Sequence, residues 1–267
     1  MNLSYKHEDT EKGFSSKRRT ALCVEYDGTD FSGFQIQNNA RTVQQVLEKA
    51  IAQVYGAQCR IYGCSRTDAG VHARAHVSHV DLPFYIPHEK IPLALNAKLP
   101  DDVVVMAAKE MPVDFHARFS CKGKIYTYRV SDHCRRPCID RRSVAHVPGQ
   151  LIVKHMKEAA QHMVGKHDFT AFCASEGLEK DPVRLINRVD VSRNPVTGYI
   201  EISVDGASFL YNMVRIMAGT LIYVGQGKIL PLDIPDIIQN KQRKRAGKTM
   251  PANGLTLERV RYDLEIF

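Results

Sequence analysis

One order of secondary structure elements occurs twice along this chain, and that repetition limits the possible folds most. In each half, hydrophobic periodicity predicts a strand, a helix, two strands, a helix and a strand. The elements of the first half are strands at 20–26, 59–63, 73–82 and 103–111, and helices at 42–55 and from about 87 to 99. The elements of the second half are strands at 124–130, 184–192, 199–204 and 257–267, and helices at 152–164, 209–224 and 234–240.

This order is the split βαβ, or ferredoxin-like, arrangement repeated by internal duplication. We expect an α+β fold in which two ferredoxin-like halves join into one continuous mixed, mainly antiparallel sheet with helices packed on it. The expected parts are a flexible N-terminal extension at 1–19, an N-terminal half at 20–114 and a C-terminal half at 115–267.

Charge and cysteine content narrow the class of protein. The chain has 267 residues with 37 Lys and Arg against 29 Asp and Glu, a formal charge of +8 that favours a polyanionic partner, nucleic acid first. An ordinary basic soluble protein fits the charge equally well. Seven cysteines at irregular spacings, without an export signal or an apolar run of membrane-spanning length, predict reduced thiols and a cytoplasmic protein that does not bind membranes.

The loop between the strands at 59–63 and 73–82 presents Arg66, Thr67 and Asp68 in succession and is closed by Gly70. Such a loop places a carboxylate at the edge of a sheet, where functional residues often lie. Asp68 is therefore a candidate catalytic acid. Capping of its own turn is the alternative, because Asp side chains bind nearby N–H groups.

The predicted helix at 209–224 is apolar nearly all round, and Arg215 is its one charged residue. An unpaired guanidinium is costly to bury, so Arg215 needs a carboxylate partner or a route to solvent. One hypothesis pairs it with Asp68 where the two halves meet, which would keep the carboxylate ionised. Gly219, one turn further along, leaves room for another segment to approach this helix.

From residue 20 onward, the chain resembles the TruA family of tRNA pseudouridine synthases through an ordered set of motifs. The N-terminal motifs are Glu25-Tyr26-Asp27-Gly28-Thr29, Gly33-Phe34-Gln35, Arg41-Thr42-Val43-Gln44, Arg66-Thr67-Asp68-Ala69-Gly70-Val71-His72-Ala73 and Asn96-Ala97-Lys98-Leu99-Pro100. The later motifs are Asp114-Phe115-His116-Ala117-Arg118-Phe119-Ser120, Tyr126-Thr127-Tyr128-Arg129, His167-Asp168-Phe169-Thr170-Ala171-Phe172, Asn212-Met213-Val214-Arg215 and Pro251-Ala252-Asn253-Gly254-Leu255-Thr256-Leu257.

The resemblance implies isomerisation of uridine to pseudouridine in the anticodon stem-loop of tRNA, at positions 38 to 40, in a cleft between the halves. It implies that Asp68 is the essential aspartate, Tyr126 a tyrosine beside the flipped base, and Arg215 the partner of Asp68. Leu255 would line the uracil pocket, and Arg66 would hold the flipped nucleotide or fill the gap it leaves. A homodimer that holds tRNA across both subunits is also implied.

Three residues depart from the family pattern, in which Gly, Trp and Gln are common. They are Ser65, Phe34 and His76. None of them is one of the implied substrate residues, so we expect the departures to affect loop geometry and RNA contacts rather than the chemistry.

The side chains in these motifs suit a reaction that needs no cofactor. A single carboxylate suffices to attack either ribose C1′ or uracil C6, whereas a glycosidase uses two carboxylates. Tyr126 and Tyr128 fall on one face of a strand, where stacking on a base is predicted for Tyr126 and core packing for Tyr128. Basic groups are collective candidates for phosphate contacts, namely Lys241–Lys248, Lys122, Lys124, Arg135, Arg136, Arg141 and Arg142.

Two other classes of protein fit the sequence less well. A metal-dependent hydrolase would use His72, His76 and His79, but the alternation around them indicates a strand, and zinc ligands at this spacing need a helix. Cys134 and Cys138 are separated by three residues and have no matching second pair, which disfavours structural zinc. A non-catalytic tandem RNA-binding module explains the charge and the duplication, but its aromatic strand signature is missing from both halves.

Overall fold

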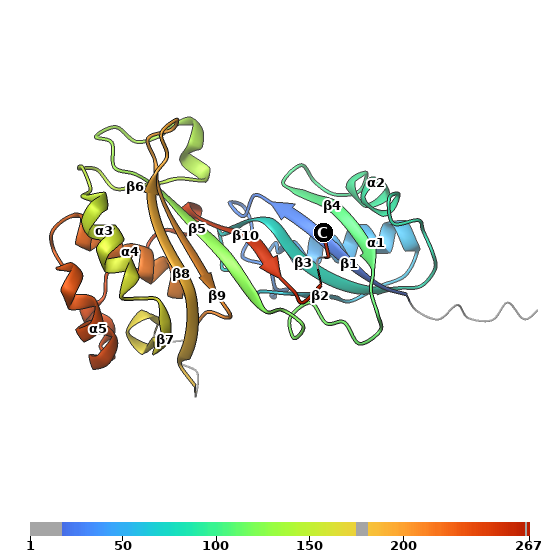
Figure 1. Ribbon diagram of the computed structural model, residues 1–267. Coiled ribbons are helices and arrows are strands. Elements are labelled where there is room, and N and C mark those ends of the chain that lie inside the picture. The colour runs from blue at the N-terminus through green and yellow to red at the C-terminus, as the bar shows by residue number, and fades with distance from the viewer. Residues whose placement is uncertain (1–17, 175–180, 265) are drawn as a thin grey trace, which may run out of the picture.

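The sheet of this protein runs through both halves of the chain. The structure, a computed structural model, describes residues 18–174, 181–264 and 266–267. Within these residues the sheet has ten strands in the order β4-β1-β3-β10-β5-β9-β8-β7, with β2 paired to β3 and β6 to β5. In Figure 1, α1 and α2 lie at one end of the sheet and α3, α4 and α5 at the other.

The N-terminal half has the strand order β4-β1-β3-β2, and all its neighbouring strands are antiparallel. This is the order of a ferredoxin-like unit. Its elements are β1 (Arg18–Tyr26), α1 (Val43–Tyr55), β2 (Ile61–Gly63), β3 (His72–Leu82), α2 (Ile91–Asn96) and β4 (Val103–Glu110).

The C-terminal half repeats that order as β10-β5-β9-β8, again antiparallel throughout. The repeated elements are β5 (Gly123–Ser131), α3 (Val153–Gln161), β8 (Val183–Arg193), β9 (Ile200–Gly206), α4 (Met213–Gly225) and β10 (Leu255–Arg261). The added elements are β6 (Ala145–His146), β7 (Gly165–Asp168), α5 (Ile234–Asn240) and 3₁₀ turns at Ile139–Arg142, Thr170–Phe172, Pro231–Asp233, Arg243–Arg245 and Ala252–Gly254.

A short parallel pairing between β3 and β10 joins the two halves. It aligns Thr256 with His72 and Leu257 with Ala73. This pairing makes the sheet continuous and mixed, so the predicted fold class is confirmed. It also brings the Asp68 loop, just before β3, close to elements of the C-terminal half.

Several element boundaries differ from the prediction. The helix predicted from residue 209 begins at Met213, because Asn212 has a left-handed backbone (φ 60°) that interrupts the apolar run. The last strand is Leu255–Arg261 rather than 257–267. The predicted extension lies outside the described residues as far as residue 17, whereas Arg18 and Arg19 belong to β1.

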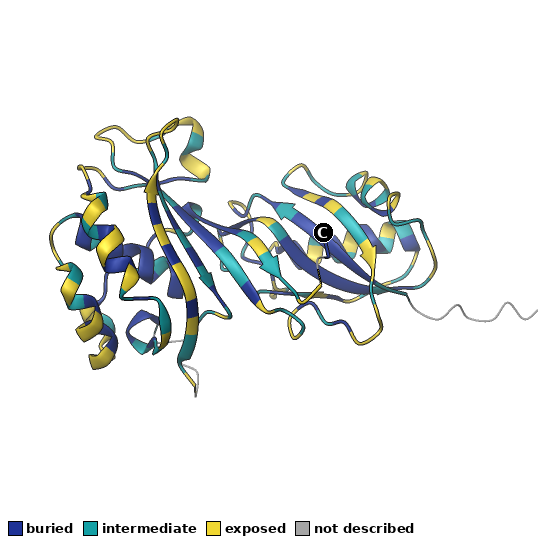
Figure 2. Cartoon of the chain, viewed as in Figure 1, coloured by how far each residue is buried: buried dark blue, intermediate teal, exposed yellow. Residues whose placement is uncertain are grey.

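The core follows the apolar faces that the sequence predicted. On α1, buried Val43, Leu47 and Ile51 recur at helical spacing, and the Thr42 side chain accepts the Gln45 N–H as the N-cap. Figure 2 shows exposed residues alternating with buried ones along β8, as expected for a strand with one open face. No helix among the described residues has the length and hydrophobicity needed to cross a membrane.

Candidate active site

The Asp68 loop connects β2 to β3 and is held by backbone on both sides. The Thr67 carbonyl accepts the Phe34 N–H at 3.1 Å, and the Thr67 hydroxyl lies 2.8 Å from the Tyr26 hydroxyl. Gly70 has a positive φ of 78° and donates its N–H to the Phe31 carbonyl. These contacts fix the loop, so the direction of the Asp68 side chain is set before any substrate binds.

The Asp68 carboxylate pairs with Arg215, as the sequence hypothesis predicted. Arg215 Nη1 lies 3.2 Å from Asp68 Oδ2, and the two side chains are 17% and 23% exposed. The carboxylate thus accepts its hydrogen bond from Arg215 rather than from its own turn, which contradicts the capping alternative. Arg215 does not reach freely into solvent either, because its partner holds it inside the cleft.

Arg215 is itself anchored by two oxygen atoms. Its Nε donates to the Met250 carbonyl at 2.8 Å, and its Nη1 donates to Asn212 Oδ1 at 2.6 Å. Asn212 has a left-handed backbone and is the N-cap residue of α4, so its side chain lies at the start of the helix that carries the arginine. Gly219 lets the 247–250 segment approach, because a Cβ there would lie 2.0 Å from the Lys248 carbonyl oxygen. The room predicted at Gly219 is therefore occupied by backbone.

Burial and the arginine act on the Asp68 carboxyl in opposite directions. Burial raises its pKa and the Arg215 charge lowers it, and burial has the larger effect, so the pKa is raised above its usual value. Arg215 therefore limits the rise in pKa and orients the carboxylate.

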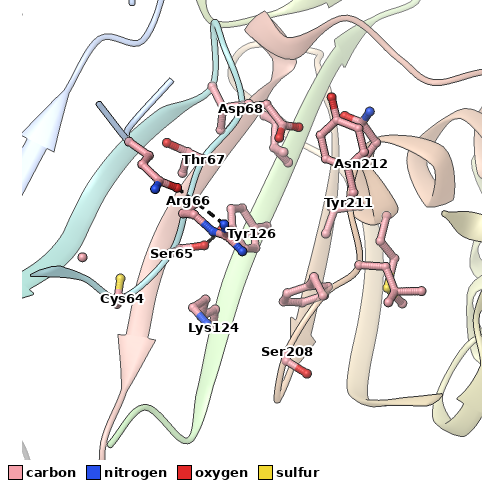
Figure 3. Close-up of a pocket in the computed structure, with 18 of the residues that line it drawn as sticks. Cys64, Ser65, Arg66, Thr67, Asp68, Lys124, Tyr126, Ser208, Tyr211 and Asn212 are labelled. Carbon is pink, nitrogen blue, oxygen red and sulfur yellow. Dashed lines mark hydrogen bonds between the residues drawn. The ribbon is translucent and has the colours of Figure 1, made fainter. Parts of the chain in front are cut away.

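Asp68 and Arg215 open onto a cavity of about 1230 Å³ that residues from both halves line. The other predicted site residues, Arg66, Tyr126 and Leu255, line the same cavity. Figure 3 shows the Asp68 loop and β5 on one side of it, with Tyr211 and Asn212 on the other. The structure thus brings all five predicted residues to one cavity.

Tyr126 and Tyr128 occupy the two environments that were predicted for them. Tyr128 is fully buried and donates its hydroxyl to the Pro251 carbonyl at 2.9 Å. Tyr126 faces the cavity, with its ring packed edge-on against Phe209 and its hydroxyl 3.0 Å from Ser65 Oγ. Of these two tyrosines, Tyr126 is therefore the one that lines the cavity.

The three departures from the family pattern form one contact chain beside Tyr126. Phe34 stacks on His76 with ring centroids 4.1 Å apart, and His76 Nε2–H donates to the Ser65 carbonyl at 3.0 Å. The Ser65 hydroxyl in turn contacts Tyr126. The departures therefore support the loop and one cavity residue, in line with the expectation that they affect local geometry.

Some cavity residues were not singled out from the sequence. Lys124 lines the cavity from β5, and Ser208 and Tyr211 line it from the turn before α4. Lys124 was grouped only with the basic clusters, and its place two residues before Tyr126 was the one signal that both lie on the same strand face. The turn was missed because its apolar sequence continues the helical pattern.

The predicted histidine and cysteine positions do not converge on a metal site. His76 contacts the Ser65 carbonyl, His72 the Arg142 carbonyl, and His79 the Ala117 N–H, so each imidazole has its own partner. All three lie on strand β3, as predicted. In the part of the chain that the structure describes, no group of three or more His, Cys, Asp or Glu residues is placed to hold a metal ion.

The basic run at 241–248 is partly engaged within the protein. Lys241 pairs with Asp168 at 2.7 Å, Arg245 pairs with Asp236 at 2.5 Å, and Arg243 donates to the Gly247 carbonyl. Such surface ion pairs contribute little to stability and still leave positive potential at the surface.

Comparison with known proteins gives concordant matches. The family model described as tRNA pseudouridine synthase matches residues 22–120 and 159–263. The tRNA pseudouridine synthase A of Ruminiclostridium cellulolyticum is 46% identical over 245 residues, covering 92% of this chain and 100% of that protein. The proteins of the same name from Clostridium acetobutylicum (43% identity; 92% and 100% covered) and Bacillus pumilus (44%; 90% and 97%) are similar to it as well.

Proposed function

This chain belongs to the tRNA pseudouridine synthase family, and we propose that it isomerises uridine in tRNA with Asp68 as its catalytic carboxylate. The enzyme is an isomerase: the bond from ribose C1′ to uracil N1 breaks, the ring turns, and C5 takes the place of N1. The C5 hydrogen leaves as a proton and N1 gains one, so the reaction needs neither a redox cofactor nor a group donor.

The observation that carries the proposal is the Asp68–Arg215 pair at the cavity. A nucleophilic carboxylate must be ionised and fixed in direction. Arg215, 3.2 Å away, favours the ionised form against the effect of burial and holds the carboxylate in one direction. The carboxylate attacks either ribose C1′ or uracil C6, and both routes use the same ionised group. No second carboxylate is needed as a general acid, because the uracil stays in the site and rejoins the ribose through C5.

The proposed substrate contacts follow from the lining of the cavity. The target uridine leaves its stack to reach Asp68, as bases do in other enzymes that act on them. Tyr126 stacks on or packs beside the flipped base, and Leu255, at the start of β10, supplies an apolar wall for the uracil ring. Arg66, which is exposed at the cavity, holds the flipped nucleotide or occupies the gap that it leaves in the stem.

The RNA target and the oligomeric state are part of the same proposal. The target uridines are those at positions 38 to 40 of the anticodon stem-loop, and basic groups around the cavity position the RNA through its phosphates. The enzyme acts as a cytoplasmic homodimer. Residues 20–114 form the half that carries the Asp68 loop, and residues 115–267 form the half that completes the site.

Tritium release tests this function directly. tRNA transcripts labelled at uracil C5 and carrying uridine at only one of positions 38, 39 and 40 should release tritium with the wild-type protein and not with Asp68→Ala. A transcript with cytidine at all three positions is the matched control. Binding without release from any transcript would support the alternative, a non-catalytic tandem RNA-binding module.

A further inference from the structure

An exposed aromatic side chain stands at the rim of the Asp68 cavity, and the proposed chemistry does not use it. Phe119, in the turn between β4 and β5, lines the cavity and is 77% exposed. Isolated exposed apolar residues are common on protein surfaces and need no explanation by themselves. This residue differs because its ring is held in place and lies beside a site for a nucleic acid.

The ring of Phe119 rests against His116, with centroids 4.3 Å apart and planes inclined by 35°. His116 Nδ1 accepts the N–H groups of Arg118 and Phe119, and its backbone N–H donates to Ser120 Oγ at 3.0 Å. The turn is therefore tied together from within. A ring ordered in advance loses little further entropy when a ligand stacks on it.

His116, which supports the Phe119 ring, is itself packed against a buried residue of the core. His116 packs edge-on against His79 at 4.6 Å, and the buried His79 accepts the Ala117 N–H through Nδ1. Burial lowers the pKa of His79 to about 4 and also lowers the pKa of His116, so this stack is neutral near pH 7. Arg118, on the same turn, places its guanidinium 5.8 Å from the centroid of the Phe119 ring.

We propose that Phe119 is a stacking site for an unpaired base of the substrate RNA, next to the uridine that enters the cavity, with Arg118 beside the adjoining phosphate. The inference rests on the proposed function. Extruding one nucleotide removes the stacking partner of its neighbours, and a ring at the rim of the cavity replaces that partner. The combination of a fixed aromatic face and an adjacent guanidinium matches a nucleotide, which offers a ring and an anion together.

The test measures binding of an anticodon stem-loop RNA that carries 2-aminopurine next to the target uridine. Loss of the stack should raise Kd about 5- to 100-fold in Phe119→Ala and abolish the fluorescence quenching seen with wild type. Phe119→Tyr keeps the ring and should bind within about twofold of wild type. A blunt RNA duplex without a loop is the control, and its Kd should be the same for all variants.

Three results would overturn the inference. The first is an unchanged Kd and quenching in Phe119→Ala. The second is wild-type binding in Phe119→Leu, which would indicate a need for apolar bulk rather than for an aromatic face. The third is conversion to a smaller species in sedimentation of Phe119→Ala, which would place the ring between two copies of the chain. If the wild-type protein releases tritium while any of these results is observed, the stacking inference is wrong and the proposed function stands. If the wild-type protein releases no tritium, the proposed function is wrong.

Discussion

Arg215 binds the Asp68 carboxylate at 3.2 Å while its Nε binds the Met250 carbonyl at 2.8 Å. One guanidinium therefore links the Asp68 loop of the N-terminal half to the segment that leads into β10. Loss of this link should therefore change both the ionisation of Asp68 and the packing between the two halves.

Asp68→Asn should lower kcat at least about 10³-fold, because the amide cannot act as a nucleophile. Burial disfavours the ionised carboxyl in the fold, whereas the substitution takes away the charge partner of Arg215. These two effects oppose each other, and the amide oxygen can still accept the Arg215 N–H, so Tm should stay close to that of wild type. Thermal unfolding and tRNA binding check this. A large fall in Tm, or loss of tRNA binding, would show that Asp68 is needed mainly for structure.

Removal of the Arg215 charge should raise the pKa of Asp68 further, because only burial then acts on it. Activity needs the ionised acid, so the acid limb of kcat/KM should move to higher pH in Arg215→Ala. Arg215→Lys keeps a cation and should fall between that variant and wild type. We also expect Arg215→Ala to lose about 2 to 3 kcal/mol of stability. An acid limb at the same pH in all three proteins would contradict electrostatic control by Arg215.

The hydrogen bond between Ser65 and Tyr126 can be removed from either side. Tyr126→Phe and Ser65→Ala should each lower kcat/KM about 2- to 10-fold, as expected for one hydrogen bond of about 1 kcal/mol. If this contact is the shared cause, the double variant should lose no more than either single variant. Strictly additive losses in steady-state kinetics would argue that the two hydroxyls act separately.

Gly219→Ala should destabilise the protein by about 1 to 3 kcal/mol, because the added methyl would meet the backbone of Lys248. The displaced segment includes Met250, so activity should fall as well. Gly225→Ala on the same helix is the control: its methyl would meet the flexible Met156 side chain and should cost less than about 1 kcal/mol. Helix propensity favours alanine over glycine at both positions, so a loss in urea unfolding that is no larger for Gly219→Ala than for Gly225→Ala would contradict the clash with the Lys248 backbone.

The buried His76 should make stability depend on pH. Burial lowers its pKa from 6.5 to about 4, so between these values the unfolded chain binds a proton that the native chain does not. Stability should therefore fall as the pH drops from 6.5 toward 4, by up to about 3 kcal/mol for this group. His76→Gln should reduce that dependence and leave the part that comes from His79, whose pKa burial also lowers to about 4. An unchanged slope in His76→Gln would show that other groups cause it.

The structure contradicted the sequence-based prediction at element ends more than in element order. The 209–212 segment is as apolar as the helix after it, and hydrophobicity alone does not reveal that Asn212 adopts a left-handed backbone. Among the site residues, Asp68 and Arg215 drew attention through their local surroundings. Tyr126 and Leu255 were marked by family resemblance, because a strand residue facing a cavity has the same local pattern as one facing a core.

The amino-acid sequence by itself determined the duplicated order of strands and helices, because periodicity reports which face of each element is buried. It also required a partner for the charge at Arg215, since an isolated guanidinium in an apolar helix is costly. The tertiary structure alone decided that the partner is Asp68, 147 positions away. That contact depends on the pairing of β3 with β10, and long-range pairing results from packing of whole surfaces that no local stretch of sequence encodes.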